Sequence, residues 1–389
     1  MYISCLSAEN FRNIRNSSIN FSMGVNLLYG KNAAGKTNAL EAIYLFAAGK
    51  SFRTSNEKDF ILKNSNGISK ISMKYCENGD VFHEMSIKYF NKNKKLLKYE
   101  GVDIEKVSEF LGKFRAVLFT PDHMSLIKGI PDERRKFADL ALSQIKPRYI
   151  YYLSEYYKTL LQKNSYLKNS KISGKIDFDL LSVFSEKLAE SAAVITKQRA
   201  FFCEYLQNEA DRFYKILSQE KESLSVKYLS NIKENFADTE NIKQKYIEIY
   251  NKNAKNEAKL GYTMYGPHRD DILFFIGKNI DVSSYEENYE DKKIFEYAAK
   301  TFGSQGQQRS CVLAVKLAEG EIMKNLTGQY PVFLFDDVFS ELDSDRQKFL
   351  TSLFSEKQVI ITCCENYSFD ISRISNMIKA ENGCYFNES

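Results

Sequence analysis

The chain has 389 residues, of which 43% are hydrophobic and 27% are charged, which is ordinary for a folded globular protein of about two to three domains. Its formal net charge of +5 is small for this length, so the overall charge does not by itself predict a nucleic-acid partner. The seven cysteines are irregularly placed and form no CxxC pair, which argues against a disulfide framework or a zinc site and fits a reducing cytosol.

The first residues, MYISCLSAENFRNI, lack the charged and apolar regions of a secretory signal. No window approaches the roughly 18 consecutive apolar residues that indicate a transmembrane helix. We therefore expect a soluble, cytoplasmic protein with no membrane partner.

Residues 1–120 show the pattern of an α/β domain. Short apolar runs and two segments that alternate apolar and polar residues predict strands. The predicted strands lie at 2–6, 26–29, 68–75, 82–90 and 116–119. A helix is expected to begin in the segment 30–37 and to end near Gly49. The lysine-rich tract 91–95 is expected to form an exposed turn.

Residues 121–260 have a different texture. Apolar residues from Leu181 to Leu217 follow the spacing of three and four that is typical of a helix, which at about 40 residues would be about 60 Å long. Two further helical stretches are expected at 132–168 and 240–259. We therefore predict an all-helical insertion, folded as an antiparallel bundle or a short coiled coil.

Residues 261–389 return to alternating strands and helices. Strands are predicted at 271–276, 332–335 and 359–362, and helices at 305–325 and 343–355. Because strands that alternate with helices form parallel sheets, we expect this part to complete the α/β head begun by residues 1–120. The predicted architecture is an α/β head interrupted by a helical insertion that forms a lid or arm.

The segment between the second predicted strand and the first predicted helix matches the P-loop pattern G-x-x-x-x-G-K-[ST]. It comprises Gly30, Lys31, Asn32, Ala33, Ala34, Gly35, Lys36 and Thr37. The glycines let backbone N–H groups surround phosphate oxygens at a helix N-terminus. Lys36 would bind the β- and γ-phosphates of ATP, and the Thr37 hydroxyl would bind Mg²⁺. A chance glycine-containing turn is the alternative, which the flanking strand and helix disfavour.

Two carboxylates, Asp336 and Asp337, directly follow the apolar strand 332–335. A buried strand avoids charge at its end unless that end emerges at a site. Beside a P-loop, Asp336 would bind Mg²⁺ through water, and Asp337 would orient or deprotonate the attacking water as the catalytic base. A solvated strand end is the alternative.

A third polar segment precedes the predicted helix 305–325. It comprises Ser304, Gln305, Gly306 and Gln307 and continues as Gln308 and Arg309. Ser304 is well placed to cap the helix, and a serine with backbone N–H groups at a helix start favours an anionic ligand. Taken alone, the segment is consistent with an ordinary capped helix, but its place shortly before the two aspartates favours a site.

The P-loop, the S-Q-G-Q-Q-R segment, the strand ending in two aspartates and the segment Ser340-Glu-Leu-Asp343 occur in the order found in ABC- and SMC-like ATPases. Four further segments resemble the RecF family within that group, namely Glu9–Asn13, Gly49–Thr54, Gly129–Phe137 and Gly266–Asp271. The resemblance runs from the first ten residues to the strand at 358–363. It implies an ABC-type P-loop head with a mixed sheet, interrupted by the helical insertion.

The resemblance also implies how the motifs work. In such ATPases two heads form an ATP-dependent homodimer around two ATP molecules, each bound by the P-loop of one copy and the signature of the other. Residues 304–307 would then face a γ-phosphate bound by Lys36 of the second copy. Arg12 and Asn13 correspond to the first loop, which touches the nucleotide, and Asp343 corresponds to the D-loop at the dimer interface.

Two positions refine this expectation. Most ABC ATPases carry Glu where this chain has Asp337, and the shorter side chain implies slow hydrolysis by a weak ATPase, which suits a timed switch. Thr362 occupies the usual switch position, where the family has no obligatory His.

The function that the resemblance implies is DNA repair. Proteins of this family bind double-stranded DNA and single-strand/double-strand junctions at gaps, and they load recombinase together with the mediator proteins RecO and RecR. Arg134 and Arg135 are candidate DNA contacts that could equally form internal ion pairs. A lysine cluster, more typical of solvated surface, comprises Lys92, Lys94, Lys95 and Lys98. His268 and Arg269 are expected to form a structural turn that ties the insertion to the head, with a role as ligands the alternative.

Three other classes share parts of this pattern. A transporter nucleotide-binding subunit would have the ATP motifs, but the signature lacks the L-S-G-G-Q form and the insertion is larger than such subunits usually carry. An SMC-type structural protein would need long arms, whereas residues 121–260 form only a stub. An ATPase-coupled nuclease would need an acidic metal cluster after Asp343, where too few residues follow.

Overall fold

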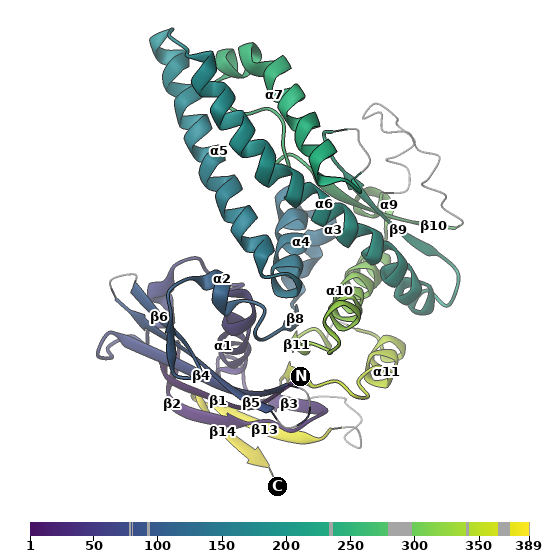
Figure 1. Cartoon of the computed structure of the whole chain (residues 1–389). Coiled ribbons are helices and arrows are strands. Elements are labelled where there is room, and N and C mark those ends of the chain that lie inside the picture. The colour runs from purple at the N-terminus through teal and green to yellow at the C-terminus, as the bar shows by residue number, and fades with distance from the viewer. Residues whose placement is uncertain are drawn as a thin grey trace. The chain divides into compact units, whose positions relative to one another are not determined.

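The computed structural model describes residues 1–77, 79, 81–91, 94–232, 236–278, 298–339, 342–364 and 374–388. The chain forms two compact units (Figure 1). Unit 1 comprises Met1–His123 and Lys316–Ser389, and unit 2 comprises Met124–Val315. The unit that contains the predicted insertion therefore continues past residue 260 to Val315. Three residues of the sequence motifs, Lys92, Ser340 and Glu341, lie outside the described residues.

The first sheet of unit 1 has six antiparallel strands in the order β2-β1-β4-β5-β6-β7. The strands are β1 (Tyr2–Phe11), β2 (Ile14–Asn20), β4 (Ile68–Glu77), β5 (Val81–Phe90), β6 (Lys94–Tyr99) and β7 (Val102–Ile104). Alternate residues such as Ile71, Met73 and Ile87 are buried, which confirms the two predicted half-buried strands. Lys94 already belongs to β6, so the turn is shorter than expected.

The second sheet of unit 1 is mixed, with the order β14-β13-β3-β12-β11-β8. The strands are β3 (Val25–Tyr29), β8 (Ala116–Phe119), β11 (Val332–Asp336), β12 (Val359–Cys363), β13 (Asn376–Glu381) and β14 (Cys384–Glu388). Neighbours pair in parallel except β14, which pairs antiparallel with β13. The register places Leu28, Thr362 and Asp336 in one row, so the carboxyl ends of three parallel strands meet at one edge.

Helix α1 (Lys36–Ala48) is buried along nearly its whole length, because residues 42–48 are all apolar and the buried Glu41 is paired with Arg12. It ends at Gly49, whose φ of 66° and bond to the carbonyl oxygen of Leu45 form the expected glycine cap. The other helices that begin in unit 1 are η1 (Glu57–Phe60), α2 (Val107–Phe110), η2 (Pro121–Met124) and α11 (Ser344–Ser352). Helix α10 (Gln305–Thr327) begins in unit 2 and ends in unit 1.

Unit 2 contains the predicted helical insertion, but it is not all-helical. Its helices are α3 (Ser125–Lys128), α4 (Pro131–Ile145), α5 (Arg148–Ser173), α6 (Phe178–Leu217), α7 (Thr239–Leu260) and α9 (Ala299–Phe302). The expectation was wrong because β9 (Ser223–Leu229), with alternating buried residues, pairs antiparallel with β10 (Asp271–Gly277). The 40 residues of α6 confirm the long helix, whereas the predicted stretch 132–168 is divided at Pro147.

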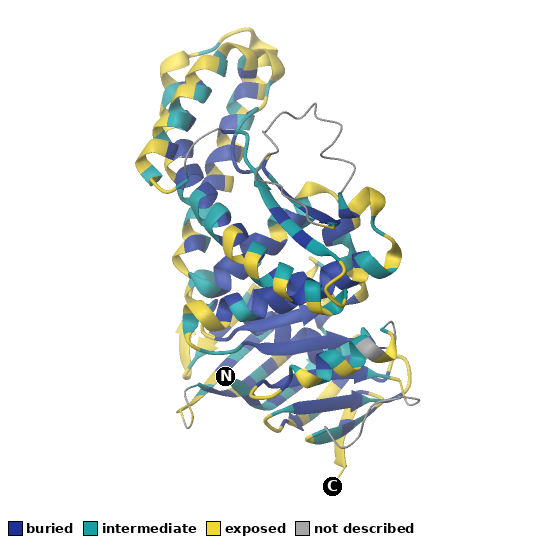
Figure 2. Cartoon of the chain, turned by 90° about the vertical axis from the view of Figure 1, so that its right-hand side faces the viewer, coloured by how far each residue is buried: buried dark blue, intermediate teal, exposed yellow. Residues whose placement is uncertain are grey.

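The long helix α6 packs against helices α5 and α7 and against strand β9 of the small sheet. Its apolar side is buried while its polar side is exposed, as the alternating colours along the helices of unit 2 show (Figure 2). It also covers the edge of β9, since Gln207 Oε1 accepts from Val226 N at 2.6 Å and Asp211 Oδ1 accepts from Leu224 N at 3.0 Å. Side chains of α6 thus satisfy backbone donors that an open strand edge would leave unpaired.

Three findings bear on the excluded classes. Within the described ranges, every helix is too short or too polar to cross a bilayer. The seven cysteines are free thiols, as expected. The part of the chain that the structure describes also contains no group of three or more His, Cys, Asp or Glu side chains arranged to hold a metal ion.

Candidate functional site

The P-loop joins the end of β3 to the start of α1, as the sequence predicts. Gly30 and Gly35 have φ angles of 151° and 114°, which residues with side chains rarely adopt. A Cβ at Gly30 would lie 2.3 Å from the carbonyl oxygen of Ala380, so only glycine fits there. Close approach between backbones therefore shapes the loop.

Lys36 and Thr37 open helix α1. Lys36 is only 5% exposed, and its Nζ donates to the carbonyl oxygens of Gly30 (2.7 Å) and Lys31 (3.1 Å). The ammonium group is thereby positioned above its own loop. The N–H groups and the dipole at the start of α1 contribute positive potential at the same place. This arrangement suits a chain of phosphates.

Asp336 ends β11 next to Thr37. Its Oδ1 accepts from Thr37 Oγ1 at 3.0 Å and from Thr362 Oγ1 at 2.9 Å. Burial raises the pKa of the Asp336 carboxyl above its ordinary value, while the two hydroxyl bonds and the charge of Arg53 act in the opposite direction. Hydroxyl and carboxylate oxygens are ligands that Mg²⁺ prefers, so Thr37 and Asp336 fit the expected metal position.

Asp337 follows in a left-handed conformation with a φ of 53°, which is uncommon for a residue other than glycine. Its backbone N–H donates to Thr362 Oγ1 at 2.9 Å. The Thr362 hydroxyl thus accepts from the backbone of Asp337 and donates to the carboxylate of Asp336. Thr362, at the predicted switch position, therefore bonds to the carboxylate of Asp336 and to the backbone of Asp337.

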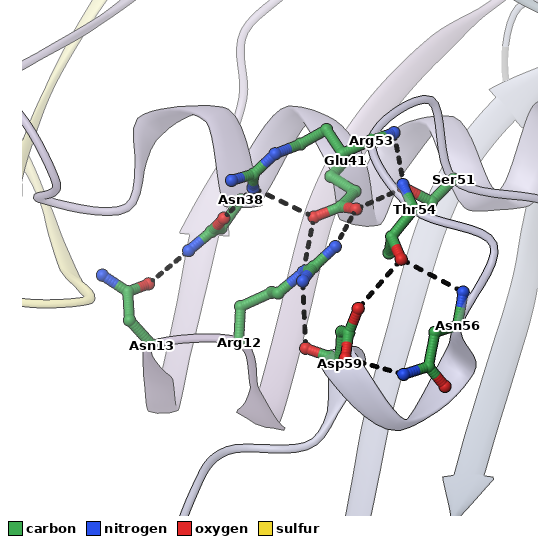
Figure 3. A network of polar contacts seen from close by, with 9 residues as sticks. All are labelled: Arg12, Asn13, Asn38, Glu41, Ser51, Arg53, Thr54, Asn56 and Asp59. Atoms are coloured by element: carbon green, nitrogen blue, oxygen red, sulfur yellow. Dashed lines mark hydrogen bonds and ion pairs between the residues drawn. The ribbon is translucent and has the colours of Figure 1, made fainter.

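Arg12 and Asn13 lie beside the P-loop, between β1 and β2 (Figure 3). Asn13 Nδ2 donates to the carbonyl oxygen of Ala33 at 3.0 Å. Arg12 makes a two-pronged ion pair with the fully buried Glu41, through Nε–Oε2 (2.8 Å) and Nη2–Oε1 (2.5 Å). Asn13 therefore contacts the loop directly, whereas the Arg12 guanidinium is bound to α1.

Asn38 and Arg53 extend this network and were not singled out from the sequence (Figure 3). Asn38 Nδ2 donates to Asn13 Oδ1 and Arg53 Nη1 donates to Asn38 Oδ1, each at 2.7 Å. The Arg53 side chain is 43% exposed, and its charge acts on the pKa of Asp336. Arg53 belongs to the segment Gly49–Thr54 that carries the family resemblance, which was the available signal.

The β13–β14 hairpin packs against the P-loop, and none of the strands predicted from the sequence includes it. Tyr385 Oη donates to the carbonyl oxygen of Gly35, and Gly383 N donates to that of Ala34, both at 2.9 Å. Asn382 and Gly383 have φ angles of 50° and 77°, which are typical of the type I′ turn of an Asn-Gly hairpin. That dipeptide was the signal that could have predicted it.

The signature segment lies in unit 2, at the start of α10. Gln307 N donates to Ser304 Oγ at 3.2 Å, and Ser304 N donates to Gln307 Oε1 at 2.8 Å, which confirms the expected helix cap. Gln307 Nε2 also donates to Glu222 Oε1 at 2.7 Å. Ser304 and Gln305 are exposed, and Gly306 is half-buried.

Asp343, the predicted D-loop residue, caps helix α11. Its Oδ1 accepts from Arg346 N at 2.9 Å, and its carboxylate also pairs with the Arg346 side chain. The Asp343 side chain is 52% exposed, so the cap leaves part of it at the surface.

Arg134 and Arg135 secure the segment Asp270–Asp271 within unit 2. Arg134 is buried and makes two parallel bonds to Asp271, Nε–Oδ1 at 2.7 Å and Nη2–Oδ2 at 2.8 Å. Arg135 Nη1 donates to the carbonyl oxygen of Asp270 at 2.8 Å. This geometry favours the internal ion pairs that the sequence left open over contacts with DNA phosphates.

His268 and Arg269 form a structural turn. His268 Nδ1 lies 2.6 Å from Tyr156 Oη, and Nε2 lies 3.3 Å from the carbonyl oxygen of Thr263. Burial lowers the pKa of the His268 imidazole to about 4. The Arg269 guanidinium lies 5.5 Å from the centroid of the Tyr262 ring. These contacts tie the turn to α5 and to its own loop.

Nearly the whole chain matches known proteins. The family model described as RecF/RecN/SMC N terminal domain matches residues 2–385. The DNA replication and repair protein RecF of Ruminiclostridium cellulolyticum is 39% identical over 386 residues, which cover 98% of each chain. The protein with the same name from Streptococcus thermophilus is 37% identical over 363 residues, covering 93% of this chain and 92% of that one.

The solved structure of the recombination mediator protein RecF with ATP in the RecFOR pathway has a TM-score of 0.88 and 32% identity, covering 100% of this chain and 98% of that one. An Smc head bound to the C-winged helix domain of ScpA has a TM-score of 0.55 at 16% identity, and it shows the fold alone. These likenesses confirm the expected ABC-type head with a mixed sheet. The chain therefore belongs to the RecF family within the RecF/RecN/SMC group of ATPases.

Proposed function

We propose that the protein is an ATP-dependent DNA-binding protein of recombinational repair and replication-fork maintenance, a weak ATPase in which ATP binding acts as a dimerisation switch. The observation that carries the proposal is the convergence of Lys36, Thr37 and Asp336 at the meeting ends of β3, β12 and β11. Membership of the RecF family supports it.

In this proposal each residue of the site has a role that its contacts allow. Lys36 binds the β- and γ-phosphates of ATP together with the P-loop N–H groups, and Asn13 supports the loop at Ala33. Thr37 and Asp336 hold Mg²⁺, which supplies charge neutralisation when bound. Asp337 orients the attacking water, and its side chain, one methylene shorter than Glu, suits slow hydrolysis.

The switch itself requires two copies of the chain. Ser304 lies exposed at the N-terminus of α10, where a hydroxyl and backbone N–H groups can bind an anion. We propose that residues 304–307 contact the γ-phosphate of ATP bound to Lys36 of the second copy, with Asp343 at the interface. The homodimer then forms only when nucleotide joins the two surfaces.

The dimer is tested by light scattering with and without ATP. Ser304→Arg should bind ATP with unchanged affinity and remain monomeric, because the larger cation fills the γ-phosphate contact. Lys36→Ala should bind ATP far more weakly and should remain monomeric at ATP concentrations that dimerise the wild type. Ser165→Arg, at an exposed position of α5, is the matched control and should dimerise like the wild type. Normal dimerisation of Ser304→Arg would show that the ATP sandwich is wrong.

The proposed partners are double-stranded DNA and single-strand/double-strand junctions, the mediator proteins RecO and RecR, and recombinase indirectly. The support is the role in DNA replication and repair, and in the RecFOR pathway, of the relatives that resemble this chain. Binding to gapped and intact duplex DNA should be compared with ATP, ADP or no nucleotide across a salt series. Equal, nucleotide-independent binding to both DNAs would contradict the proposal.

A further inference from the structure

A chain of hydrogen bonds leads from the long helix α6 to the signature segment. Its links are Tyr214 Oη to Glu222 Oε2 (3.1 Å), Gln307 Nε2 to Glu222 Oε1 (2.7 Å) and Ser304 N to Gln307 Oε1 (2.8 Å). Tyr214 is 1% exposed, so the chain starts from a side chain fixed in the interior. All four residues belong to unit 2, so this series of hydrogen bonds lies within one compact unit.

The donors and acceptors in this series of hydrogen bonds allow only one orientation of the Gln307 amide. The Tyr214 hydroxyl and the Gln307 Nε2 both donate to Glu222, whose ionised carboxylate can only accept. With Nε2 directed at Glu222, the amide presents Oε1 to Ser304 N. A reversed amide would set its NH₂ group against the Ser304 N–H, donor against donor. Glu222 and the Ser304 N–H therefore select the same amide orientation, and Glu222 anchors the end of the amide that Ser304 does not contact.

Glu222 is itself fixed by the tight turn between α6 and β9. Its N–H donates to Ser218 Oγ at 3.3 Å, and the same hydroxyl donates to the carbonyl oxygen of Glu222 at 3.0 Å. Gln219 and Glu220 complete the turn with φ angles of 55° and 60°. The carboxylate thus lies at a defined place relative to the last turn of α6, which contains Tyr214.

We propose that Glu222 is a positioning residue for the signature. It acts through Gln307 to hold Ser304 N in the cap and so directs the Ser304 hydroxyl, which accepts from Gln307 N and can still donate its proton to phosphate. The inference rests on the proposed ATP-dependent dimer, and it gives the Gln307 side chain a supporting role. Because Tyr214 belongs to α6, the same hydrogen bonds also link this long helix to the signature.

The first test is Glu222→Ala, measured as the monomer–dimer dissociation constant in a nonhydrolysable ATP analogue by analytical ultracentrifugation. We expect dimerisation about tenfold weaker, which corresponds to about 1.4 kcal/mol. The ATP affinity of the dilute monomer should be unchanged, because its P-loop belongs to unit 1. Glu186→Ala, an exposed position of α6, is the matched control and should dimerise like the wild type.

Two variants that keep a long side chain separate positioning from packing. Glu222→Gln still offers an acceptor to Gln307 Nε2, so most of the dimerisation should be retained, within about threefold of the wild type. Glu222→Lys places a donor opposite that donor and should weaken dimerisation at least as much as Glu222→Ala. These two variants decide the question even if the alanine variant unfolds.

The outcomes that overturn the inference are distinct from failure of the proposed function. Wild-type protein that stays monomeric with ATP would remove the proposed dimer and the inference with it. A wild type that dimerises while Glu222→Ala and Glu222→Lys match it would overturn the inference alone. Adding Glu222→Ala to Gln307→Ala should cause no further loss, because Glu222 acts through Gln307; additive losses would contradict this.

Discussion

The two units place their motifs by different physical means. In unit 1 backbone pairing positions the motifs, because the P-loop and Asp336 lie at the ends of strands whose register is fixed. In unit 2 side-chain hydrogen bonds position the signature. They link Ser304 to Gln307 and Gln307 to Glu222, and the last two residues lie 85 residues apart in sequence. The P-loop, the aspartates and the Ser304–Gln307 cap are visible in local patterns, whereas the contact of Gln307 with Glu222 depends on a partner far along the sequence.

Buried ion pairs occur in both units. Arg12 pairs with the fully buried Glu41 in unit 1, and unit 2 contains a pair of the same kind. Arg199, which is 1% exposed, makes two bonds to Asp139, Nε–Oδ1 at 2.8 Å and Nη2–Oδ2 at 2.9 Å, and a third to the carbonyl oxygen of Pro267 at 2.6 Å. Such pairs specify one arrangement, and loss of one partner is costly.

The largest effect is expected from Arg199→Ala, which leaves the Asp139 carboxylate in the interior without its cation. Unfolding in urea should show a loss of about 3–5 kcal/mol. Lys187→Ala breaks a pair with Glu155 at 3.9 Å whose lysine is 55% exposed, and as a control it should cost less than about 1 kcal/mol. Similar losses in both variants would show that burial does not determine the cost of losing a charged partner.

Lys36→Ala tests unit 1, where the proposed role of the Lys36 charge is to bind ATP rather than to stabilise the fold. ATP affinity should fall at least about a hundredfold, or about 2.8 kcal/mol, because the phosphates lose their main cation. The midpoint of urea unfolding should change little by comparison. Titration with a fluorescent ATP analogue measures the affinity, and a decrease of less than about threefold would contradict the assigned role.

The stability of unit 2 should depend on pH through two neighbours with opposite signs. Burial lowers the pKa of His268 to about 4, so the folded state resists protonation and stability is lost as pH falls below the unfolded value of 6.5. Burial raises the pKa of the Asp270 carboxyl to about 6 from 3.8, so stability is lost as pH rises through about 6. The two trends overlap between about pH 4 and pH 6, where they largely offset each other.

His268→Gln removes one of these trends. Between about pH 7 and pH 5 the wild type should lose about 2 kcal/mol more stability than the variant does. Urea unfolding at the two pH values measures the difference. Equal pH dependence of the two proteins would show that His268 does not stay neutral in the folded state.

The smallest effect is expected from Tyr385→Phe, which removes the hydroxyl that donates to the carbonyl oxygen of Gly35. One neutral hydrogen bond contributes about 1 kcal/mol, so ATP affinity should fall about fivefold. Phe386→Leu, at the next position and 55% exposed, is the control and should bind ATP like the wild type. Unchanged affinity of Tyr385→Phe would mean that the hairpin does not support the P-loop.

Local patterns were sufficient to predict the P-loop, the paired aspartates, the cap at Ser304 and the long helix α6. Each depends on residues within a few positions of one another, and the structure has the P-loop between strand and helix and the cap in place. The type and approximate bounds of most elements follow for the same reason.

Features that depend on distant partners could not be predicted. Whether Arg134 forms an ion pair or contacts phosphate is decided by Asp271, 137 residues later in sequence. Two omissions were avoidable, because β9 alternates its buried residues and Asn382-Gly383 is a strong hairpin signal. The helices on either side of β9 and the short length of both segments hid these signals.

The position of β3 has a consequence for synthesis of the protein. Both of its neighbours, β12 and β13, come from the other end of the chain, as does Tyr385 beneath the P-loop. A ribosome can therefore translate every P-loop residue long before the nascent chain has a structured nucleotide pocket, because the sheet that shapes it is still missing. ATP binding should appear only after β13 and β14 have left the ribosome, so an unfinished polypeptide should not yet bind ATP.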